Sequence, residues 1–401
     1  MAGATGRAER IELLDALRGF ALFGILLANI LYWSGWGLMT DGQRLELGGA
    51  DTVTWQYRFH HLFVDGKFYT IFSLLFGAGF ALQISRLTRK GEEGMRLYRR
   101  RILVLLAIGL VHSWLIWDGD ILTLYALLGL LLPWFHSWRD RSLLLCAAVL
   151  IFLVPLGGIL LFSSLGWKPQ DHLYSLSFAI AENMGANTAP DAGIEWLRRE
   201  DFMGWLSWVL SGTPFSWGLR IETWRIPKVL GIMLIGIVVG RGLAAGTLID
   251  DRRLLRRVML LGLAVGAPVS LFYALRPAQG QQDWPSIIGT VPLALAYAAA
   301  FTLLWKYCRP FLQHLAPVGR MALTNYLTHS VLGIILFYGI GFGLVGRLEP
   351  VSFYGVALLI FAAQLLFSKW WLSGHEQGPV EAFWRRASYG RRPTQLGMAG
   401  V

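Results

Sequence analysis

The sequence predicts an all-α, polytopic integral membrane protein with about ten transmembrane helices and both termini in the cytoplasm. Its 401 residues are 55% hydrophobic and only 15% charged, a composition unlike that of a soluble enzyme. Apolar runs of roughly 20 residues recur along the chain, the length that a helix needs to cross about 30 Å of hydrocarbon. Lys and Arg residues gather in alternate loops between these runs.

The apolar runs define the predicted spans. Only helices and closed barrels satisfy their backbone hydrogen bonds in lipid, and no run alternates with a period of two, so we expect every span to be helical. The basic start MAGATGRAER leads into a long apolar run without a small-residue cleavage site, which predicts a retained first span. In chain order the spans are 12–33, 67–87, 101–117, 121–136, 142–163, 225–243, 254–275, 286–306, 320–343 and 352–373.

The distribution of basic residues orients these spans. Loops assigned to the cytoplasm contain more than twice as many Lys and Arg residues as the outer loops, which is the usual bias of cytoplasmic loops. Treating the apolar segment 202–219 as a full span would invert every later loop. We therefore predict that it forms an amphipathic or re-entrant helix on the outer side.

Three regions follow from this topology. Residues 1–165 form an N-terminal five-helix half, 166–224 an extracytoplasmic segment, and 225–401 a C-terminal five-helix region with a basic cytoplasmic tail. The basic residues responsible for the net charge of +11 lie between apolar runs and form no stripe interleaved with aromatic residues. Membrane topology therefore explains them better than nucleic-acid binding does. Membrane lipids are the expected partners, with the tail meeting anionic headgroups.

The first span contains an acid and a base in otherwise apolar surroundings. Asp15 and Arg18 are three residues apart, which places them on one helix face, and Asn29 lies close to the same face. Because a charge at the bilayer centre costs about 2.5 to 3.5 kcal/mol, this face should point inward. Two interpretations stay open: a buried ion pair between helices, or a site for a substrate phosphate or carboxylate.

The hairpin between the third and fourth spans contains further polar residues. Gly119 is predicted to make the turn and Asp120 to cap the fourth helix. Asp118 is either another turn residue or a catalytic base at the outer surface. His112 lies beyond mid-membrane, and is either a hydrogen-bonded core histidine or a functional residue.

A second group of ionisable residues precedes the span at 67–87. His60, His61, Asp65 and Lys67 reach the outer membrane surface, and no metal-ligand spacing is present. A histidine and a carboxylate four or five residues apart become an oriented general base if a helical turn joins them. The alternative is that the adjacent histidines are ordinary surface residues.

Two further patterns lie within predicted spans. Asn325 and His329 are four residues apart and give the ninth span a polar face, which either lines a cavity or joins helices by hydrogen bonds. The glycine pairs Gly77 with Gly79 and Gly236 with Gly240 predict close helix packing rather than phosphate loops.

Several of these segments carry a family resemblance. LLDALRGFALFGILLANI, DGKFYTIFSLLFGAGF, GDILTLYALLG, GRMALTNYLTHS and FSKWWLSGHEQGPVEAFWRRASYG together resemble the YeiB-like family of bacterial inner-membrane proteins, a domain of unknown function. The resemblance covers nearly the whole chain and is most specific from about 225 to 390. The family has Gln more than His at the position of His329, which makes Asn325 the better candidate for a functional residue.

The first half is also similar to the wider transmembrane acyltransferase superfamily, which includes heparan-alpha-glucosaminide N-acetyltransferase and bacterial polysaccharide acyltransferases. Those proteins share an Arg-containing first span, and a histidine in the following outer loop is implicated in catalysis in the glucosaminide enzyme. The resemblance implies acyl transfer from a cytoplasmic thioester, such as an acyl-CoA, to an outer hydroxyl or amine of a glycan or lipid-linked acceptor. No bound cofactor or metal is implied.

The leading hypothesis is therefore a bacterial inner-membrane acyltransferase. His60, His61 or His112 would act as general base, Asp65 or Asp118 would orient it, and Arg18 would hold the donor. Asp15, Asn29, Asn325 and His329 are the remaining candidates for substrate binding. A membrane transporter whose polar faces line a substrate path is the alternative, and a non-catalytic scaffold is the third interpretation.

Overall fold

A computed structural model of the chain describes residues 7–87, 91–189, 191–276 and 280–389. Every regular element in these residues is a helix, which confirms the predicted all-α class. The helices of the first half that match predicted spans are α1 (Arg7–Trp33), α3 (Lys67–Leu87), α4 (Gly91–Leu115), α5 (Leu122–Phe135) and a continuous segment of α6 (Asp140–Ala148), the π-helical turn η4 (Val149–Leu153) and α7 (Val154–Leu165).

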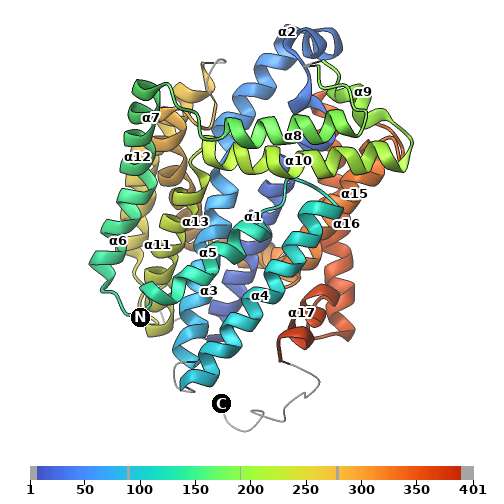
Figure 1. The fold of residues 1–401 in the computed structure, drawn as a ribbon. Coiled ribbons are helices and arrows are strands. Elements are labelled where there is room, and N and C mark those ends of the chain that lie inside the picture. The colour runs from blue at the N-terminus through green and yellow to red at the C-terminus, as the bar shows by residue number, and fades with distance from the viewer. Residues whose placement is uncertain (1–6, 88–90, 190, 277–279, 390–401) are drawn as a thin grey trace.

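The second half supplies the remaining upright helices. They are α11 (Arg225–Ala245), α12 (Arg252–Ala274), α13 (Trp284–Leu312), the short α14 (Ala316–Arg320), α15 (Ala322–Phe337) and α16 (Pro350–Gly374), followed by α17 (Pro379–Tyr389). Figure 1 shows α3, α4, α11, α12, α13, α15 and α16 as one bundle, which brings the two halves of the chain side by side.

Six helical segments of the described chain are long and apolar enough to cross a membrane, and each overlaps one of the predicted spans over most of that span's length. α5 and α15 are shorter apolar helices, and the count of ten stays a prediction. Large apolar side chains are exposed on the outside of the bundle, with Leu160 at 73%, Leu261 at 67% and Leu359 at 71%. Such a surface is unfavourable in water and suits lipid, so the protein is a membrane protein.

A layer of helices covers one end of the bundle. It consists of α2 (Asp41–Phe59), α8 (Asp171–Asn183), α9 (Gly193–Arg198) and α10 (Phe202–Glu222). In Figure 1, α8 and α10 lie across the top of the upright helices, and α2 rises beside them. The segment 202–219 therefore belongs to a helix that crosses the bundle rather than running with it.

The opposite end is held by α17. The Trp384 indole donates to the backbone oxygen of Arg101 in α4 at 2.8 Å. The Glu381 carboxylate caps α15, because it accepts from the backbone nitrogens of Leu323 at 2.7 Å and Thr324 at 3.0 Å. In Figure 1, α17 lies at the end away from α8 and α10. Which end faces the cytoplasm stays a prediction, as does lipid binding by the tail, whose residues 390–401 lie outside the described chain.

Glycine packing joins α3 to α11. A Cβ on Gly77 would collide with the backbone of Met233, and one on Gly236 with the backbone of Leu74; one on Gly240 would lie 2.5 Å from the Ala78 oxygen. The predicted close packing is thus confirmed for these three glycines. It is wrong for Gly79, where a Cβ would meet nothing within 4 Å because this residue faces away from α11.

This contrast gives a matched pair of variants. We expect Gly77→Ala to lower the melting temperature by several degrees, because the two helices must separate to admit a methyl group. Gly79→Ala should leave it unchanged or raise it, since Ala is the better helix former by about 1 kcal/mol. Thermal unfolding of both variants in detergent measures the difference. Equal melting temperatures would contradict the assigned packing.

Candidate functional site

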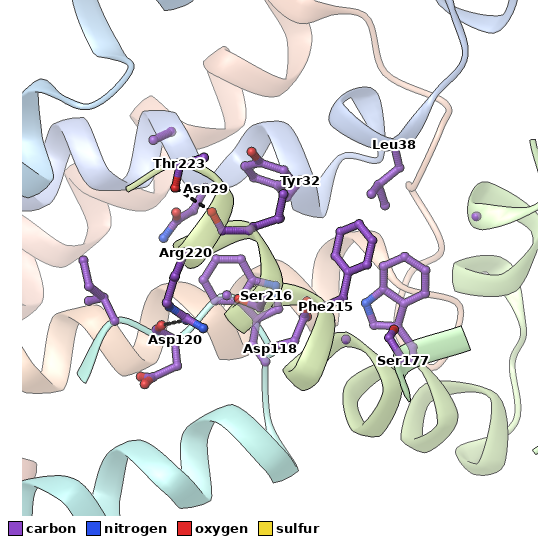
Figure 2. Close-up of a pocket in the computed structure, with 18 of the residues that line it drawn as sticks. Asn29, Tyr32, Leu38, Asp118, Asp120, Ser177, Phe215, Ser216, Arg220 and Thr223 are labelled. Carbon is purple, nitrogen blue, oxygen red and sulfur yellow. Dashed lines mark hydrogen bonds between the residues drawn. The ribbon is translucent and has the colours of Figure 1, made fainter. Parts of the chain in front are cut away.

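A cavity of about 620 Å³ lies where the covering layer meets the bundle. Its walls come from the C-terminal half of α1, the 116–121 turn, the start of α3, α8, α10 and the residues after α10. Figure 2 shows Asn29 and Tyr32 of α1 close to Arg220 of α10 and to Asp118 and Asp120 of the turn. The volume suits a small ligand or part of a larger one.

Four of the residues predicted from sequence line this cavity. They come from three separate segments of the chain and are Asn29, His60, Asp65 and Asp118. The other six do not line it: Asp15, Arg18, His61, His112, Asn325 and His329. A ligand in the cavity can therefore reach the first four candidates, whereas the other six lie outside its lining.

Asp118 lines the cavity with a carboxyl group that is partly unpartnered. Its Oδ1 atom is buried without a hydrogen-bond partner among the described residues. Burial raises the pKa of the Asp118 carboxyl to about 6, more than the nearby Arg220 lowers it. Gly212 of α10 permits this placement, since a Cβ there would lie 2.7 Å from the Asp118 carboxyl carbon. A carboxyl that titrates near neutral pH can take up and release protons.

Arg220 and Arg225 line the same cavity, and neither was identified as a site residue from the sequence. The Arg220 Nη2 donates to the backbone oxygen of Asp120, as Figure 2 shows, while its Nη1 has no partner among the described residues. Between the two arginines, Trp224 adopts a left-handed conformation with φ of 55°, which costs free energy for a residue with a Cβ. This turn ends α10 and starts α11 so that both arginines face the cavity.

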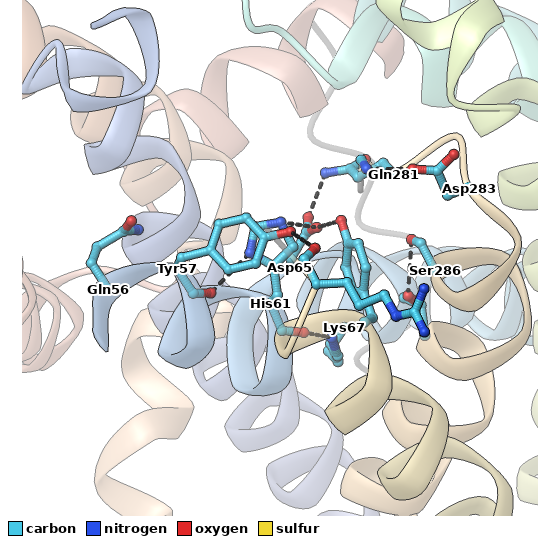
Figure 3. Close-up of polar contacts among 12 residues, drawn as sticks. Gln56, Tyr57, His61, Asp65, Lys67, Gln281, Asp283 and Ser286 are labelled. Atoms are coloured by element: carbon cyan, nitrogen blue, oxygen red, sulfur yellow. Dashed lines mark hydrogen bonds and ion pairs between the residues drawn. The ribbon is translucent and has the colours of Figure 1, made fainter. Parts of the chain in front are cut away.

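Asp65 is the centre of a hydrogen-bonded group at the edge of the cavity (Figure 3). Its carboxylate accepts from the Tyr273 hydroxyl at 2.9 Å and from the Gln281 amide, and its Oδ2 lies 4.0 Å from the Nε2 of His61. His61 Nδ1 donates to the Tyr57 oxygen at 2.9 Å. The π-helical turn η2 (His60–Val64) brings His61 and Asp65 together, as the four-residue spacing suggested.

His60 differs from its neighbour. It is 7% exposed, lines the cavity, and its Nδ1 has no hydrogen-bond partner in the described chain. A buried imidazole nitrogen without a partner is rare in folded proteins and is typical of a group that waits for a ligand.

His112 is enclosed, with no exposed surface. Its Nδ1 donates to the Asp120 carboxylate at 2.9 Å, and its Nε2 accepts from the Ser330 hydroxyl at 2.9 Å. Asp120 also accepts from the backbone nitrogens of Leu122 at 3.0 Å and Thr123 at 2.7 Å, so its predicted role as the cap of α5 is confirmed. These contacts agree with the interpretation of His112 as a hydrogen-bonded core histidine.

Asn325 and His329 hold α15 against α16. Asn325 donates to the Ser368 hydroxyl at 3.0 Å, and His329 Nε2 donates to the Gln364 side-chain oxygen at 2.6 Å. Gln364 in turn donates to the Asn325 backbone oxygen at 3.1 Å. Of the two interpretations left open by the sequence, helix association matches these contacts and a cavity lining does not.

Asp15 and Arg18 form an ion pair at 2.5 Å. The Arg18 side chain is 30% exposed and that of Asp15 is 14% exposed. Gly319 of α14 fits directly against the Asp15 backbone, where a Cβ would collide. The pair thus lies beside α14, two or more helical turns along α1 from the cavity-lining Asn29.

Within the described chain, no three His, Cys, Asp or Glu side chains group closely enough to hold a metal ion.

Comparison with known proteins places the chain in a family. Residues 241–391 match the family model described as "Protein of unknown function (DUF418)". Over 95% of its length the chain is 30% identical to the uncharacterized protein YxaH of Bacillus subtilis (strain 168), covering 94% of that protein. The chain belongs to the DUF418 family. The resemblance to YeiB-like proteins is thereby confirmed.

Two other relatives of this DUF418 protein also match over nearly their whole length. One is the uncharacterized protein YeiB of Escherichia coli (strain K12), 32% identical over 94% of this chain and 96% of the relative. Another is an uncharacterized 39.9 kDa protein of Bacillus acidopullulyticus, 33% identical over 96% of this chain and 95% of the relative. No solved structure matches the fold. Most cavity residues, including Asp118 and Arg220, precede the part matched by the family model.

Proposed function

We propose that this DUF418 protein is a bacterial inner-membrane acyltransferase, which moves an acyl group from a cytoplasmic thioester donor to an outer hydroxyl or amine acceptor on a glycan or lipid. One observation supports this above all others. An imidazole nitrogen of His60, a carboxylate oxygen of Asp118 and a guanidinium nitrogen of Arg220 are all buried without partners among the described residues, and all three residues line one cavity.

These groups suit the steps of acyl transfer. The Asp118 carboxylate would take the proton from the acceptor hydroxyl or amine, whose oxygen or nitrogen then forms a bond to the thioester carbonyl carbon. Arg220 would bind the acceptor through its unpartnered nitrogen and hold the reacting hydroxyl or amine beside Asp118. When the carbon–sulfur bond breaks, the thiolate leaves and takes a proton, so the products are the acylated acceptor and the free thiol. His60 is a second proton acceptor within the same cavity.

The donor side remains part of the proposal. Arg18 lies near the end of α1 that precedes the cavity and is partly exposed, so its guanidinium can attract the phosphates of a donor such as an acyl-CoA. Asp15, which is paired with it, holds the guanidinium in one orientation. Arg18 therefore keeps its proposed role in donor binding.

The test uses purified full-length protein in detergent, radiolabelled acyl-CoA donors and a panel of glycan and lipid acceptors. We expect wild type to transfer label. If the imidazole moves a proton in the reaction, His60→Ala should transfer label at a rate at least about 10²-fold lower. His172→Ala on α8 is the matched control, because His172 is exposed and lies outside the cavity lining. If His60→Ala and His172→Ala lower the transfer rate equally, His60 has no role in the mechanism.

Transport is the outcome that would replace this proposal. A transporter would move a solute into proteoliposomes without any acyl donor, and cavity substitutions would change uptake rather than labelling. The same preparation distinguishes the two functions when solute uptake and label transfer are measured in parallel. Absence of label transfer with every donor and acceptor, together with donor-independent uptake, would overturn the acyltransferase proposal.

A further inference from the structure

The positive charges of Arg220 and Arg225 are not paired with carboxylates in the described part of the chain. The hydrogen bonds of Arg220 and Arg225 go to neutral acceptors: the Asp120 backbone oxygen and, at 2.6 Å, the Gln281 side-chain oxygen. Each guanidinium also lies over an aromatic ring, 4.8 Å from the centroid of Trp217 and 5.1 Å from that of Tyr69. Neither arginine forms an ion pair with a carboxylate within the described part of the chain.

Several arginines on the surface of the protein behave differently. Among the described residues, five form ion pairs with Asp or Glu side chains: Arg18, Arg44, Arg199, Arg241 and Arg309. A charge removed from water without a partner of opposite sign is costly, so a buried arginine normally has a carboxylate beside it. Arg220 is only 4% exposed. The carboxylates of Asp118 and Asp120 act on its charge from a distance, but neither forms the close ion pair that burial of a guanidinium normally requires.

Unpartnered nitrogen atoms show where a bound anion would lie. Arg220 Nη1 and Arg225 Nε are both buried without a partner among the described residues, and both residues line the cavity. Because each arginine offers a separate free N–H, the ligand must present oxygens to two donors at once. A carboxylate carries one charge, which one guanidinium already balances, whereas a phosphate group carries up to two charges and several acceptor oxygens.

We propose that Arg220 and Arg225 together bind a phosphate group of the acceptor, either free in solution or carried by a lipid. This inference rests on the proposed function and names the acceptor class for the same site. The strained Trp224 between the two arginines fixes their spacing, and its ring stacks on Phe162 at 5.3 Å. Strain of this kind persists where the surroundings hold it and often marks a ligand site.

The rest of the cavity suits the remainder of such an acceptor. Apolar and aromatic side chains that include Phe68, Phe178 and Phe215 line it beside the polar groups, and they can hold a lipid chain or a sugar face. With its phosphate on the two arginines, the acceptor would place a nearby hydroxyl or amine at Asp118. The arginines would then position the acceptor, and Asp118 would receive its proton.

Binding can be measured without any acyl donor. Full-length protein in phosphate-free detergent buffer is titrated with inorganic phosphate and, separately, with short-chain phosphatidylglycerol; short-chain diacylglycerol is the uncharged comparison. Intrinsic fluorescence reports binding, because Trp117, Trp196 and Trp208 line the cavity. We expect both phosphate probes to bind and diacylglycerol to bind at least about tenfold more weakly, since it lacks the charge-assisted hydrogen bonds.

Variants decide whether the two arginines are responsible. Arg220→Gln and Arg225→Gln should each weaken phosphate binding about tenfold or more, whereas Arg58→Gln on the exposed part of α2 should leave it unchanged. If Arg220→Gln does not fold, Arg225→Gln and Arg225→Lys decide the matter, and loss of affinity in both supports a planar two-donor site.

The two sources of phosphate give different results. If inorganic phosphate binds but phosphatidylglycerol does not, the acceptor is a free phosphorylated molecule. If phosphatidylglycerol binds more strongly than inorganic phosphate, the phosphate of the acceptor is carried by a lipid. No binding of either probe to wild type, or wild-type affinity in folded Arg220→Gln and Arg225→Gln, would overturn the inference. Binding with no acyl transfer in any assay would instead overturn the proposed function while leaving the phosphate site intact.

Discussion

Asp118→Asn is expected to reduce acyl transfer by about 10² to 10⁴-fold, the usual contribution of a positioned general base. The amide fills the same space but cannot accept a proton. Because the pKa of Asp118 is raised to about 6, wild-type activity should increase with pH through that value and level off above it. Asp171→Asn on α8 is the matched control, an exposed carboxylate on the same side of the protein. A full rate in Asp118→Asn would exclude this carboxylate as the base.

The same substitution should raise stability. A carboxyl whose pKa is higher in the folded than in the unfolded state destabilises the fold as it ionises, between its ordinary value near 3.8 and about 6. We therefore expect Asp118→Asn to melt at a higher temperature than wild type at pH 8, with the difference shrinking toward pH 4. A lower melting temperature at pH 8 would show that the ionised carboxylate stabilises the fold instead.

Asp120→Ala has the largest expected effect on stability, about 3 to 5 kcal/mol, because it removes one partner from a buried polar group. The change deletes three contacts at once, with the backbone nitrogens of Leu122 and Thr123 and with His112 Nδ1. α5 loses its cap, and the enclosed imidazole loses its acceptor. We expect the variant to accumulate poorly and to melt at least ten degrees below wild type.

Asp120→Asn provides the comparison for that variant. The amide oxygen can still accept from the backbone of α5, and His112 can donate from its other nitrogen to Ser330, so the loss should be smaller than for Ala. Thermal unfolding in detergent ranks the three proteins. A melting temperature for Asp120→Ala equal to that of Asp120→Asn would show that the cap and the histidine contact contribute little.

Much of the fold could be predicted because apolar length alone indicates a span. α2 was missed, since its polar composition and Gly49, with φ of 72°, interrupt any apolar pattern. A signal for its start was nevertheless present: Thr40 and Gln43 form a capping box, whose spacing can be recognised in a sequence. α10 has the composition of a span although it lies across the bundle, because it packs Trp205, Trp208 and Trp217 against the core.

The site could be predicted only in part. Asp118 and His60 were identifiable because ionisable residues near an apolar core need an explanation. Arg220 and Arg225 were counted only as outer-loop charges, since their shared direction depends on the left-handed turn at Trp224 and on the packing of α10 over the bundle. Conversely, Ser330 and Ser368, which bind His112 and Asn325, are distant from them in sequence, so these hydrogen bonds could not be predicted locally.

Label transfer across sealed membrane vesicles tests the central claim most directly. Radiolabelled acyl-CoA is supplied to the cytoplasmic face of inside-out vesicles that contain wild type or Asp118→Asn, and acylated acceptor is collected from the lumen, which corresponds to the outer side. We expect labelled acceptor in the lumen of wild-type vesicles and a rate at least about 10²-fold lower with Asp118→Asn. Label confined to the donor face, or equal luminal labelling by both proteins, would contradict catalysis in the cavity.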